Sequence, residues 1–361
     1  MTALIRAVVE TAALRHNLAV VRRQAPQARV LAVVKANAYG HGSVVAAKAL
    51  ADADAFAVAR LEEGIQLREA GLTHPVLLLE GVFNAEQLAA AARHGFEIVV
   101  HSPAQLALLQ AWRGEHRFRA WIKLDSGMHR LGFAVEDFPA AYAALAACGA
   151  VLPQPVLMTH LANADAVDDG MTSAQLRAFA KAVAGLPGER SIANTAGVFG
   201  WAESQGDQGD WVRPGLALYG ASPFADRSAA ALGLRPAMTL LSQVIAVKQV
   251  PAGGAVGYGG AWRTTRATRL AVVAAGYADG YPRNTAAGCP VLVNGREAPV
   301  VGRVSMDMLT VDVTDHAAVA AGDPVVLWGE GVPVETVAAA AGTIAWELLC
   351  GVSQRVSPDP R

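Results

Sequence analysis

A lysine follows directly on a short apolar run near the start of the chain. Lys35 comes after the run 30–34 and precedes the glycine-containing segment 36–42. Burial disfavours the ammonium form, so an amine at the end of a buried strand can attack a carbonyl group, as in Schiff-base formation. A lysine at a strand end also commonly reaches solvent along its flexible stem. Position alone favours the solvent-exposed interpretation of Lys35 and leaves the Schiff base as the sharper alternative.

A second cluster of cationic side chains lies in the segment 123–132. Lys123 falls inside the apolar run 120–124, and Arg130 falls in the segment that follows it. The planar guanidinium fork matches a carboxylate, so Arg130 would suit an amino-acid or keto-acid substrate. An ordinary ion pair explains the same arginine equally well.

Later apolar runs also end in polar residues or glycine. A hydroxyl at Thr195 and the backbone amides of Gly215 and Leu216 could bind a phosphate, as the late strands of barrel enzymes often do. A satisfied core histidine is as good an account of His160 as a functional one. The residues at these ends are Thr159, His160, Asn194, Thr195 and Arg213, which precedes the expected eighth strand.

The elements that must position these residues alternate between apolar runs and Ala-rich helical segments. Eight such runs predict a (β/α)8 barrel with the polar residues at its mouth, and the count favours this over a doubly wound open sheet. Ser43 is the expected N-cap of the first helix after Lys35. The expected strands are 30–34, 55–59, 76–79, 97–100, 120–124, 156–159, 191–193 and 216–219, and expected helices include 43–50, 60–70, 85–94 and 103–112.

After residue 235 the pattern changes to alternating, β-branched runs separated by turns. Asn294-Gly295 between two such runs is a strong hairpin signal. The chain is therefore expected to divide into an N-terminal strand in 1–10 that packs with the second domain, a barrel over 11–232, and a mostly β domain over 233–361. The expected strands of this domain are 240–250, 270–273, 291–293, 300–301, 309–313 and 325–328.

Composition and charge exclude several classes of partner. The 30 Lys and Arg balance 31 Asp and Glu without any block of like charge, so neither nucleic acid nor an anionic membrane surface is an expected partner. No apolar run is long enough to cross a bilayer, and the start lacks a signal-peptide pattern, which favours a cytoplasmic location. Three widely spaced cysteines disfavour a disulfide framework and a metal site.

Taken together, the segments resemble bacterial alanine racemases over nearly the whole chain and in the same order. Ala-Val-Val-Lys-Ala-Asn-Ala-Tyr-Gly-His-Gly at 32–42 is similar to the segment of that family that carries the cofactor lysine. No dinucleotide fingerprint, P-loop or nucleophile elbow competes with this assignment. The other similar segments are 123–132, 159–165, 193–196, 212–215, 257–259, 276–281 and 302–307.

The resemblance implies a homodimeric, barrel-type enzyme that interconverts L- and D-alanine with pyridoxal 5′-phosphate (PLP). Lys35 would carry PLP and act as one base, and Tyr258 of the partner subunit would be the other, tuned by His160 and Arg213. The active sites of the dimer would thus be shared.

The resemblance also implies roles for the remaining site residues. Arg213 would face the pyridine nitrogen, and Lys123 matches a position that carries a carbamate in some members. Gln354 stands where many members have a phosphate-contacting tyrosine, so that contact is not carried over. The phosphate would be held by Tyr39, Thr195, Gly215 and Leu216, the cofactor set would include His160 and Asn194, and the substrate would meet Arg130, Met306 and, at the entrance, Tyr277.

Three other functions fit parts of the pattern. A racemase of broader specificity stays open, because pocket size depends on loop positions that the sequence does not rank. A PLP-dependent decarboxylase would not need a second proton donor at Tyr258. A non-catalytic PLP carrier would end after the barrel, whereas this chain continues with the segments around Tyr258, Tyr277 and Met306.

Overall fold

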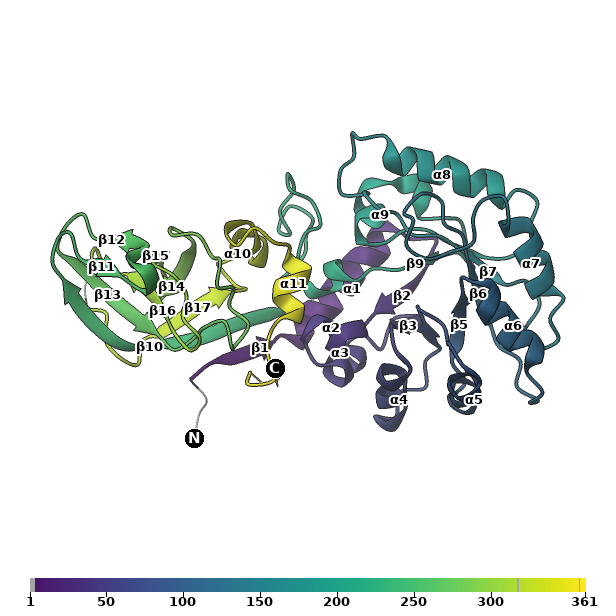
Figure 1. The fold of residues 1–361 in the computed structure, drawn as a ribbon, viewed down its shortest axis with the longest axis horizontal. Coiled ribbons are helices and arrows are strands. Elements are labelled where there is room, and N and C mark those ends of the chain that lie inside the picture. Colours follow the sequence, from purple (N-terminus) through teal and green to yellow (C-terminus); the bar gives the residue numbers. More distant parts are fainter. Residues whose placement is uncertain (1–3, 317, 357) are drawn as a thin grey trace.

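The computed structural model describes residues 4–316, 318–356 and 358–361. Figure 1 shows two bodies side by side, a barrel ringed by helices and a mostly β domain, joined near the strand β1 (Arg6–Val9). The sequence-based prediction of fold class is confirmed by this arrangement. Residues 1–3 of the expected N-terminal strand lie outside the described residues.

The first body is a closed barrel of eight parallel strands. The strands are short runs whose side chains are almost all buried, because helices cover them outside and side chains from opposite strands fill the inside. They are β2 (Arg29–Val33), β3 (Ala55–Val58), β4 (Val76–Leu78), β5 (Glu97–Val100), β6 (Ala120–Lys123), β7 (Val156–Met158), β8 (Arg190–Ser191) and β9 (Trp211–Val212).

The expected eighth strand at 216–219 was wrong. Leu216–Tyr219 is the 3-10 helix η2, and the barrel closes instead through β9, whose residue Trp211 pairs with Arg29 of β2. A short, fully buried apolar run has the same appearance in a strand and in a buried helical turn, so its apolar character did not decide between them. Arg213 therefore follows the last strand directly and lies among the other strand-end residues.

The barrel helices lie close to their expected positions. Ser43 is not the N-cap of its helix: it is the first helical residue, Gly42 is the cap, and the Ser43 amide donates to Asn37 Oδ1 at 2.9 Å. The helices are α1 (Thr11–Gln24), α2 (Lys35–Tyr39), α3 (Ser43–Ala49), α4 (Leu61–Glu69), α5 (Ala85–His94), α6 (Pro103–Ala111), α7 (Phe138–Ala146), α8 (Met171–Ala182) and α9 (Thr195–Gly200), with the 3-10 turn η1 (Ala202–Ser204).

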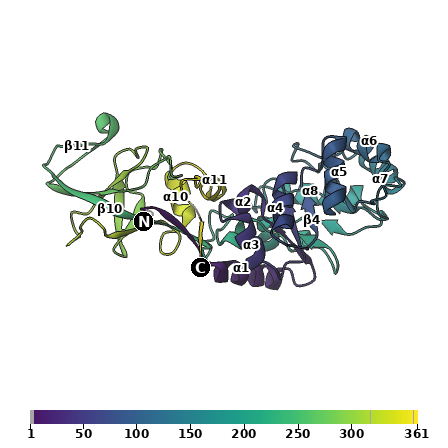
Figure 2. The ribbon, with the colours of Figure 1, turned by 90° about the horizontal axis from the view of Figure 1, so that it is seen from below.

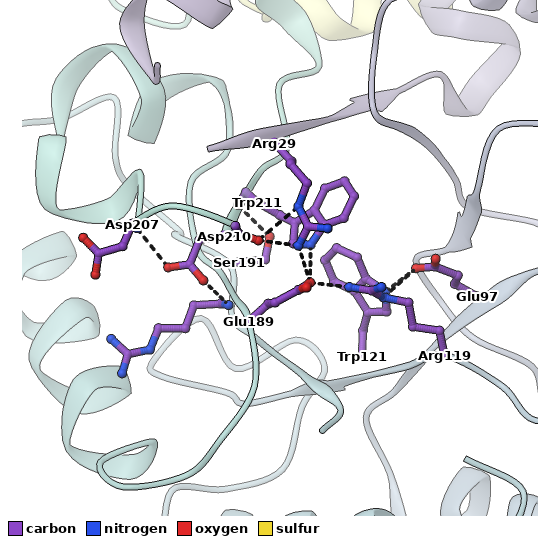
Figure 3. A network of polar contacts seen from close by, with 11 residues as sticks. Arg29, Glu97, Arg119, Trp121, Glu189, Ser191, Asp207, Asp210 and Trp211 are labelled. Carbon is purple, nitrogen blue, oxygen red and sulfur yellow. Dashed lines mark hydrogen bonds and ion pairs between the residues drawn. The ribbon is translucent and has the colours of Figure 1, made fainter. Parts of the chain in front are cut away.

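A ring of charged side chains fills the end of the barrel where the strands begin (Figure 3). The Glu189 carboxylate lies between Arg29, at 2.5 Å, and Arg119, and it also accepts from Trp211 Nε1 at 2.7 Å. Arg119 reaches Glu97 on its other side, at 3.7 Å. Polar residues at this end of a barrel serve stability, because barrel enzymes place their chemistry at the opposite end.

The second body is a mostly β domain built on one large sheet in the order β13-β16-β15-β14-β17-β10-β1-β18, in which β13 also pairs with β10. The predicted hairpin is confirmed: Val293 pairs with Arg296, and Asn294 and Gly295 have φ of 50° and 75°. The strands are β10 (Met238–Val250), β11 (Ala255–Val256), β12 (Trp262–Arg263), β13 (Thr268–Val273), β14 (Pro290–Val293), β15 (Arg296–Val301), β16 (Leu309–Asp312), β17 (Pro324–Trp328) and β18 (Pro358–Pro360), with the turn η3 (Tyr258–Gly260).

The two bodies are tied together at several points. β1 precedes the barrel yet pairs with β10 on one side and β18 on the other. Helices α10 (Val334–Ala340) and α11 (Ala345–Cys350) of the second body lie between its sheet and the barrel in Figures 1 and 2, and α11 contacts α2. Over the described residues, none of the helices combines the length and apolarity that a membrane span requires.

Candidate active site

Lys35 leaves the end of β2 and begins a turn of unusual hand. The four residues after it, Ala36 to Tyr39, all have φ near +53°, which makes α2 a left-handed helical turn without any glycine before Gly40. Each such residue costs roughly 1–2 kcal/mol relative to the right-handed form. Strain of this kind persists only where the surroundings determine the conformation, and it gathers at functional sites.

The Lys35 amine lies half-buried among other cations. Burial lowers its pKa, and the positive charge of Arg130 lowers it further. Glu80 and Glu63 act in the opposite direction, but the net pKa stays below the ordinary value. A larger share of the neutral, nucleophilic amine at neutral pH follows from this environment.

Two hydroxyls and the start of η2 form a compact polar cluster next to this turn. Thr195 Oγ1 accepts from the Gly215 amide at 3.1 Å and from the Ala217 amide at 3.3 Å. The Tyr39 hydroxyl lies directly against Gly215, where any Cβ would overlap it. Burial raises the pKa of Tyr39, so its phenol stays protonated and can donate. Leu216 begins η2 and is buried beside these groups.

Arg213 is buried and donates through both of its terminal nitrogens. Its guanidinium donates to Ser191 Oγ at 2.5 Å, to the Thr159 carbonyl at 2.6 Å and to the Ile192 carbonyl at 3.2 Å. It also meets His160 Nδ1 at 3.3 Å, which assigns that ring nitrogen as an acceptor. Burial and then the charge of Arg213 hold the pKa of His160 well below its usual range, so the imidazole is neutral.

Lys123 and Arg130 complete a group of four cations at this end of the barrel. Lys123 is only 6% exposed, and its pKa falls to about 8 through burial, followed by the charges of Arg130 and Arg213. Arg130 is exposed on the loop after β6. The Asp125 carboxylate shapes that loop by accepting from the amides of Gly127 and His129, each at 3.0 Å.

The predicted cofactor residue Asn194 uses its side chain for the fold. Asn194 Oδ1 accepts from the Gly197 amide at 2.9 Å and caps α9, while its Nδ2 donates to the Leu161 carbonyl at 3.2 Å. Both ends of the amide are thus occupied, and the residue fixes the position of Thr195 next to it.

The structure does not bring the predicted residues of the second domain to Lys35 of the same chain. Tyr258 and Met306 line a surface hollow of about 570 Å³, and they are 64% and 52% exposed. Within the described residues this hollow is lined entirely by the second domain. β11 and β12, which flank η3 and Tyr258, lie at the end of that domain remote from the barrel (Figure 1). Tyr277 is 40% exposed and bonds through its amide to the Ser305 carbonyl, beside Met306.

Two family models cover most of the chain. The alanine racemase N-terminal domain matches residues 9–223, and the alanine racemase C-terminal domain matches residues 237–358. The chain belongs to the alanine racemase family.

Relatives in the alanine racemase family match over the full length. An alanine racemase from Shewanella baltica is 51% identical over 352 residues, which cover 98% of each chain. One from Aeromonas hydrophila is 50% identical over 96% of this chain and 97% of its own. The crystal structure of the biosynthetic alanine racemase from Pseudomonas aeruginosa superposes with a TM-score of 0.96 at 44% identity, with all of both chains covered. The resemblance of the motifs to this family is therefore confirmed.

Three residues of this alanine racemase family member contribute to the site without having been predicted from the sequence. Glu63 accepts from the amide that follows Lys35, at 2.7 Å, and Tyr219 stacks on Tyr39 with ring centroids 4.7 Å apart. His41 is fully buried beneath the turn and bonds through Nδ1 to the Tyr39 carbonyl at 2.8 Å. For Glu63 there was a signal, because a glutamate at the third position of a helix often caps its start.

Gln354, where many alanine racemases are expected to carry a tyrosine, is exposed on the segment after α11. Its neighbour Arg355 pairs with Asp307 at 2.8 Å and with the buried Asp279 at 3.4 Å. These pairs fix the segment against the loop that carries Met306, so the segment supports the exposed hollow of the second domain.

Proposed function

We propose that the protein interconverts L- and D-alanine, using PLP held on Lys35 and a second base, Tyr258, supplied by the partner subunit. The observation that carries the proposal is the convergence, at the strand ends of one barrel, of a half-buried amine with two hydroxyls beside the backbone at Gly215 and with two arginines. Membership of the alanine racemase family supports the same reaction.

The residues present fit PLP. The Lys35 amine suits its aldehyde, and the hydroxyls of Tyr39 and Thr195 with the backbone at Gly215 suit a phosphate, which accepts hydrogen bonds and needs a close backbone approach. A side chain at residue 215 would overlap the Tyr39 hydroxyl. When bound, PLP supplies the electron sink that makes an α-proton removable.

Inversion requires one acid/base group on each face of the α-carbon. Lys35, with its lowered pKa, can take or return a proton on one face. Tyr258 would serve the other face from the partner subunit. It is exposed, and the strands that flank it, β11 and β12, lie remote from the barrel of their own chain (Figure 1). The exposed apolar side chains of Tyr258, Met306 and Met308 fit burial against a second copy.

Arg213 would govern how strongly the cofactor withdraws electrons. A guanidinium only donates, so a pyridine nitrogen beside it would keep its lone pair unprotonated. We infer that this restrains side reactions such as transamination. The four acceptors around Arg213 hold it rigidly for that purpose.

The substrate carboxylate would meet Arg130 and Met306.

Lys123 is too crowded by cations to add a further positive charge without cost. We propose that its neutral amine adds to CO₂, forming an N–C bond and releasing a proton, so that a carbamate faces Arg130. Intact mass spectrometry compares wild type with Lys123→Met in bicarbonate buffer and in CO₂-free buffer. Only wild type in bicarbonate buffer should show a mass gain of one CO₂.

A chiral assay tests the central assignment. The purified protein should convert L-alanine to a racemic mixture, and Lys35→Ala should lose both borohydride-fixable PLP and turnover. If Lys35→Ala bound PLP covalently and turned over normally, the assignment would be wrong. Tyr258→Phe should impair the two directions of α-proton exchange unequally, because it removes the base on one face only.

Specificity is a separate question that the same assay addresses. A panel of amino acids of increasing side-chain size distinguishes an enzyme strict for alanine from a broad-specificity racemase. We expect alanine to be turned over fastest, and comparable rates with larger side chains would favour the broader activity.

A further inference from the structure

The left-handed turn after Lys35 needs an external support at its start. The first amides of any helical turn lack partners within it, and here Ala36 contributes such an amide while adopting φ of 53°. Later residues of the turn have hydrogen-bond partners nearby in the chain. The Ala38 amide donates to the Val34 carbonyl at 2.9 Å, and His41 Nδ1 hydrogen-bonds the carbonyls of Ala38 and Tyr39. These contacts leave the Lys35–Ala36 peptide to be fixed by another group.

Glu63 provides that support from the neighbouring strand–helix unit. Its Oε1 accepts from the Ala36 amide at 2.7 Å, and its Oε2 accepts from the amides of Ala59 and Arg60 at 2.8 and 3.0 Å. The carboxylate thus joins the end of β3 and the start of α4 to the residue that follows Lys35.

Helix capping alone does not account for this arrangement. A glutamate at the third helical position returns to the cap amide, here that of Arg60. The bond to Ala36 spans 27 residues of sequence and connects two different units of the barrel. Hydrogen bonds to an ionised acceptor are stronger than those between neutral groups. Three of them on one carboxylate therefore fix the Ala36 amide firmly relative to the start of α4.

We propose that Glu63 is a positioning residue that holds the left-handed turn in the conformation from which Lys35 reaches the cofactor. The inference rests on the proposed role of Lys35 as the PLP-bearing residue. Glu63 touches neither substrate nor cofactor in this account, and it acts through the peptide after Lys35.

The test compares Glu63→Gln with Glu62→Gln. Glutamine keeps the shape of Glu63 but replaces one carboxylate oxygen with an NH₂ group, a donor that faces backbone amides. Glu62 is exposed in the same helical turn, so Glu62→Gln removes the same charge without touching these amides. Apo protein is titrated with PLP, attachment at Lys35 is fixed with borohydride and mapped, and urea unfolding of the apo protein is measured in parallel. Glu63→Gln should bind PLP about tenfold more weakly, and Glu62→Gln should stay within about twofold of wild type.

A suppressor separates support of the turn from general stabilisation. Glycine adopts positive φ without steric cost, so adding Ala36→Gly to Glu63→Gln should recover much of the lost PLP affinity. A purely capping role predicts lower apo-protein stability, unchanged PLP affinity and no recovery, and that result would overturn the proposal.

Two further outcomes are decisive. If wild type binds PLP on Lys35 and Glu63→Gln binds it equally well, the role of Glu63 is refuted while the proposed function stands; if wild type carries no PLP on Lys35, both fail. Should Glu63→Gln not fold, hydrogen exchange in wild type decides: a protected Ala36 amide supports the proposal, and exchange as fast as in an unfolded chain contradicts it.

Discussion

The cations that gather at the barrel mouth lower the stability of the folded protein, and the pKa of Lys123 shows this cost. Lys123 shares this region with Lys35, Arg130 and Arg213, and its folded-state pKa of about 8 lies below the ordinary 10.5. The unfolded chain therefore binds more protons between these two values. The penalty on folding is full below pH 8 and is relieved as the pH rises toward 10.5.

Replacing Lys123 should expose this cost directly. In CO₂-free buffer at pH 7, apo Lys123→Met should be more stable than wild type by up to about 3 kcal/mol, and the difference should shrink between pH 8 and 10.5. Urea unfolding across this range measures it. The exposed Lys181→Met serves as control and should show no such trend; a constant difference at all pH values would refute the assignment.

His41 makes the stability of the protein depend on pH in the acidic range. It is fully buried and its folded-state pKa is about 4, through burial, so the folded protein resists the protonation that the unfolded chain accepts below pH 6.5. Stability should fall as the pH drops from 6.5 toward 4. His41→Asn, which keeps a donor near the Nδ1 position, should flatten this slope in pH-dependent urea unfolding, and an unchanged slope would contradict the role of His41.

At the scale of elements, η2 depends on the small size of its preceding residue. Gly215→Ala should push the Tyr39 hydroxyl out of the proposed phosphate site, because a Cβ there overlaps it. We expect PLP affinity to fall at least about tenfold while the barrel stays folded. Gly149→Ala, at an exposed glycine with open space around it, is the control; equal PLP affinity in both variants would contradict the pocket assignment.

The ring of charges at the other end of the barrel should matter for stability alone. Glu189→Gln leaves Arg29 and Arg119 facing each other without their shared carboxylate, and we expect a loss of about 2 kcal/mol in unfolding free energy. Glu115→Gln removes the same charge from an exposed site and should change stability by less than about 0.5 kcal/mol. Turnover per folded molecule should be equal in both variants and wild type; a specific loss in Glu189→Gln would assign this ring a catalytic influence.

Local sequence patterns predicted most elements. They failed where contacts with another segment of the chain determine the conformation. The first seven barrel strands and the Asn294-Gly295 hairpin follow from apolar runs and turn residues. The run 216–219 became η2 because it packs as a buried turn after Gly215, and Ser43 lost its capping role to Gly42. The part played by Glu63 depends on β3 and α4 lying beside α2, which no local pattern contains. The left-handed turn has the same origin, since its alanines favour an ordinary helix.

At the scale of the whole molecule, the proposed sharing of active sites between two subunits makes a distinctive prediction for mixed dimers. Lys35→Ala and Tyr258→Phe should each be nearly inactive alone. In refolded equimolar mixtures, about half of the dimers would be mixed, and each would contain one site with both bases intact, so about a quarter of all sites should work. Racemase activity that appears on mixing, together with mixed dimers in native mass spectrometry, checks this. A Tyr258 acting on its own chain would give mixed dimers without any intact site.

The place of β1 in the sheet imposes an order on synthesis. β1 is flanked by β10 and β18, whose residues leave the ribosome more than 200 residues later. Apart from the closing pair β2 and β9, the strands of the barrel find their neighbours close in sequence. At about 5–20 residues per second, β1 with its apolar Ala7, Val8 and Val9 waits at least about ten seconds for a partner. During that interval the nascent chain carries an unpaired apolar strand beside a complete or nearly complete barrel, so β1 stays open to wrong pairing until β10 emerges.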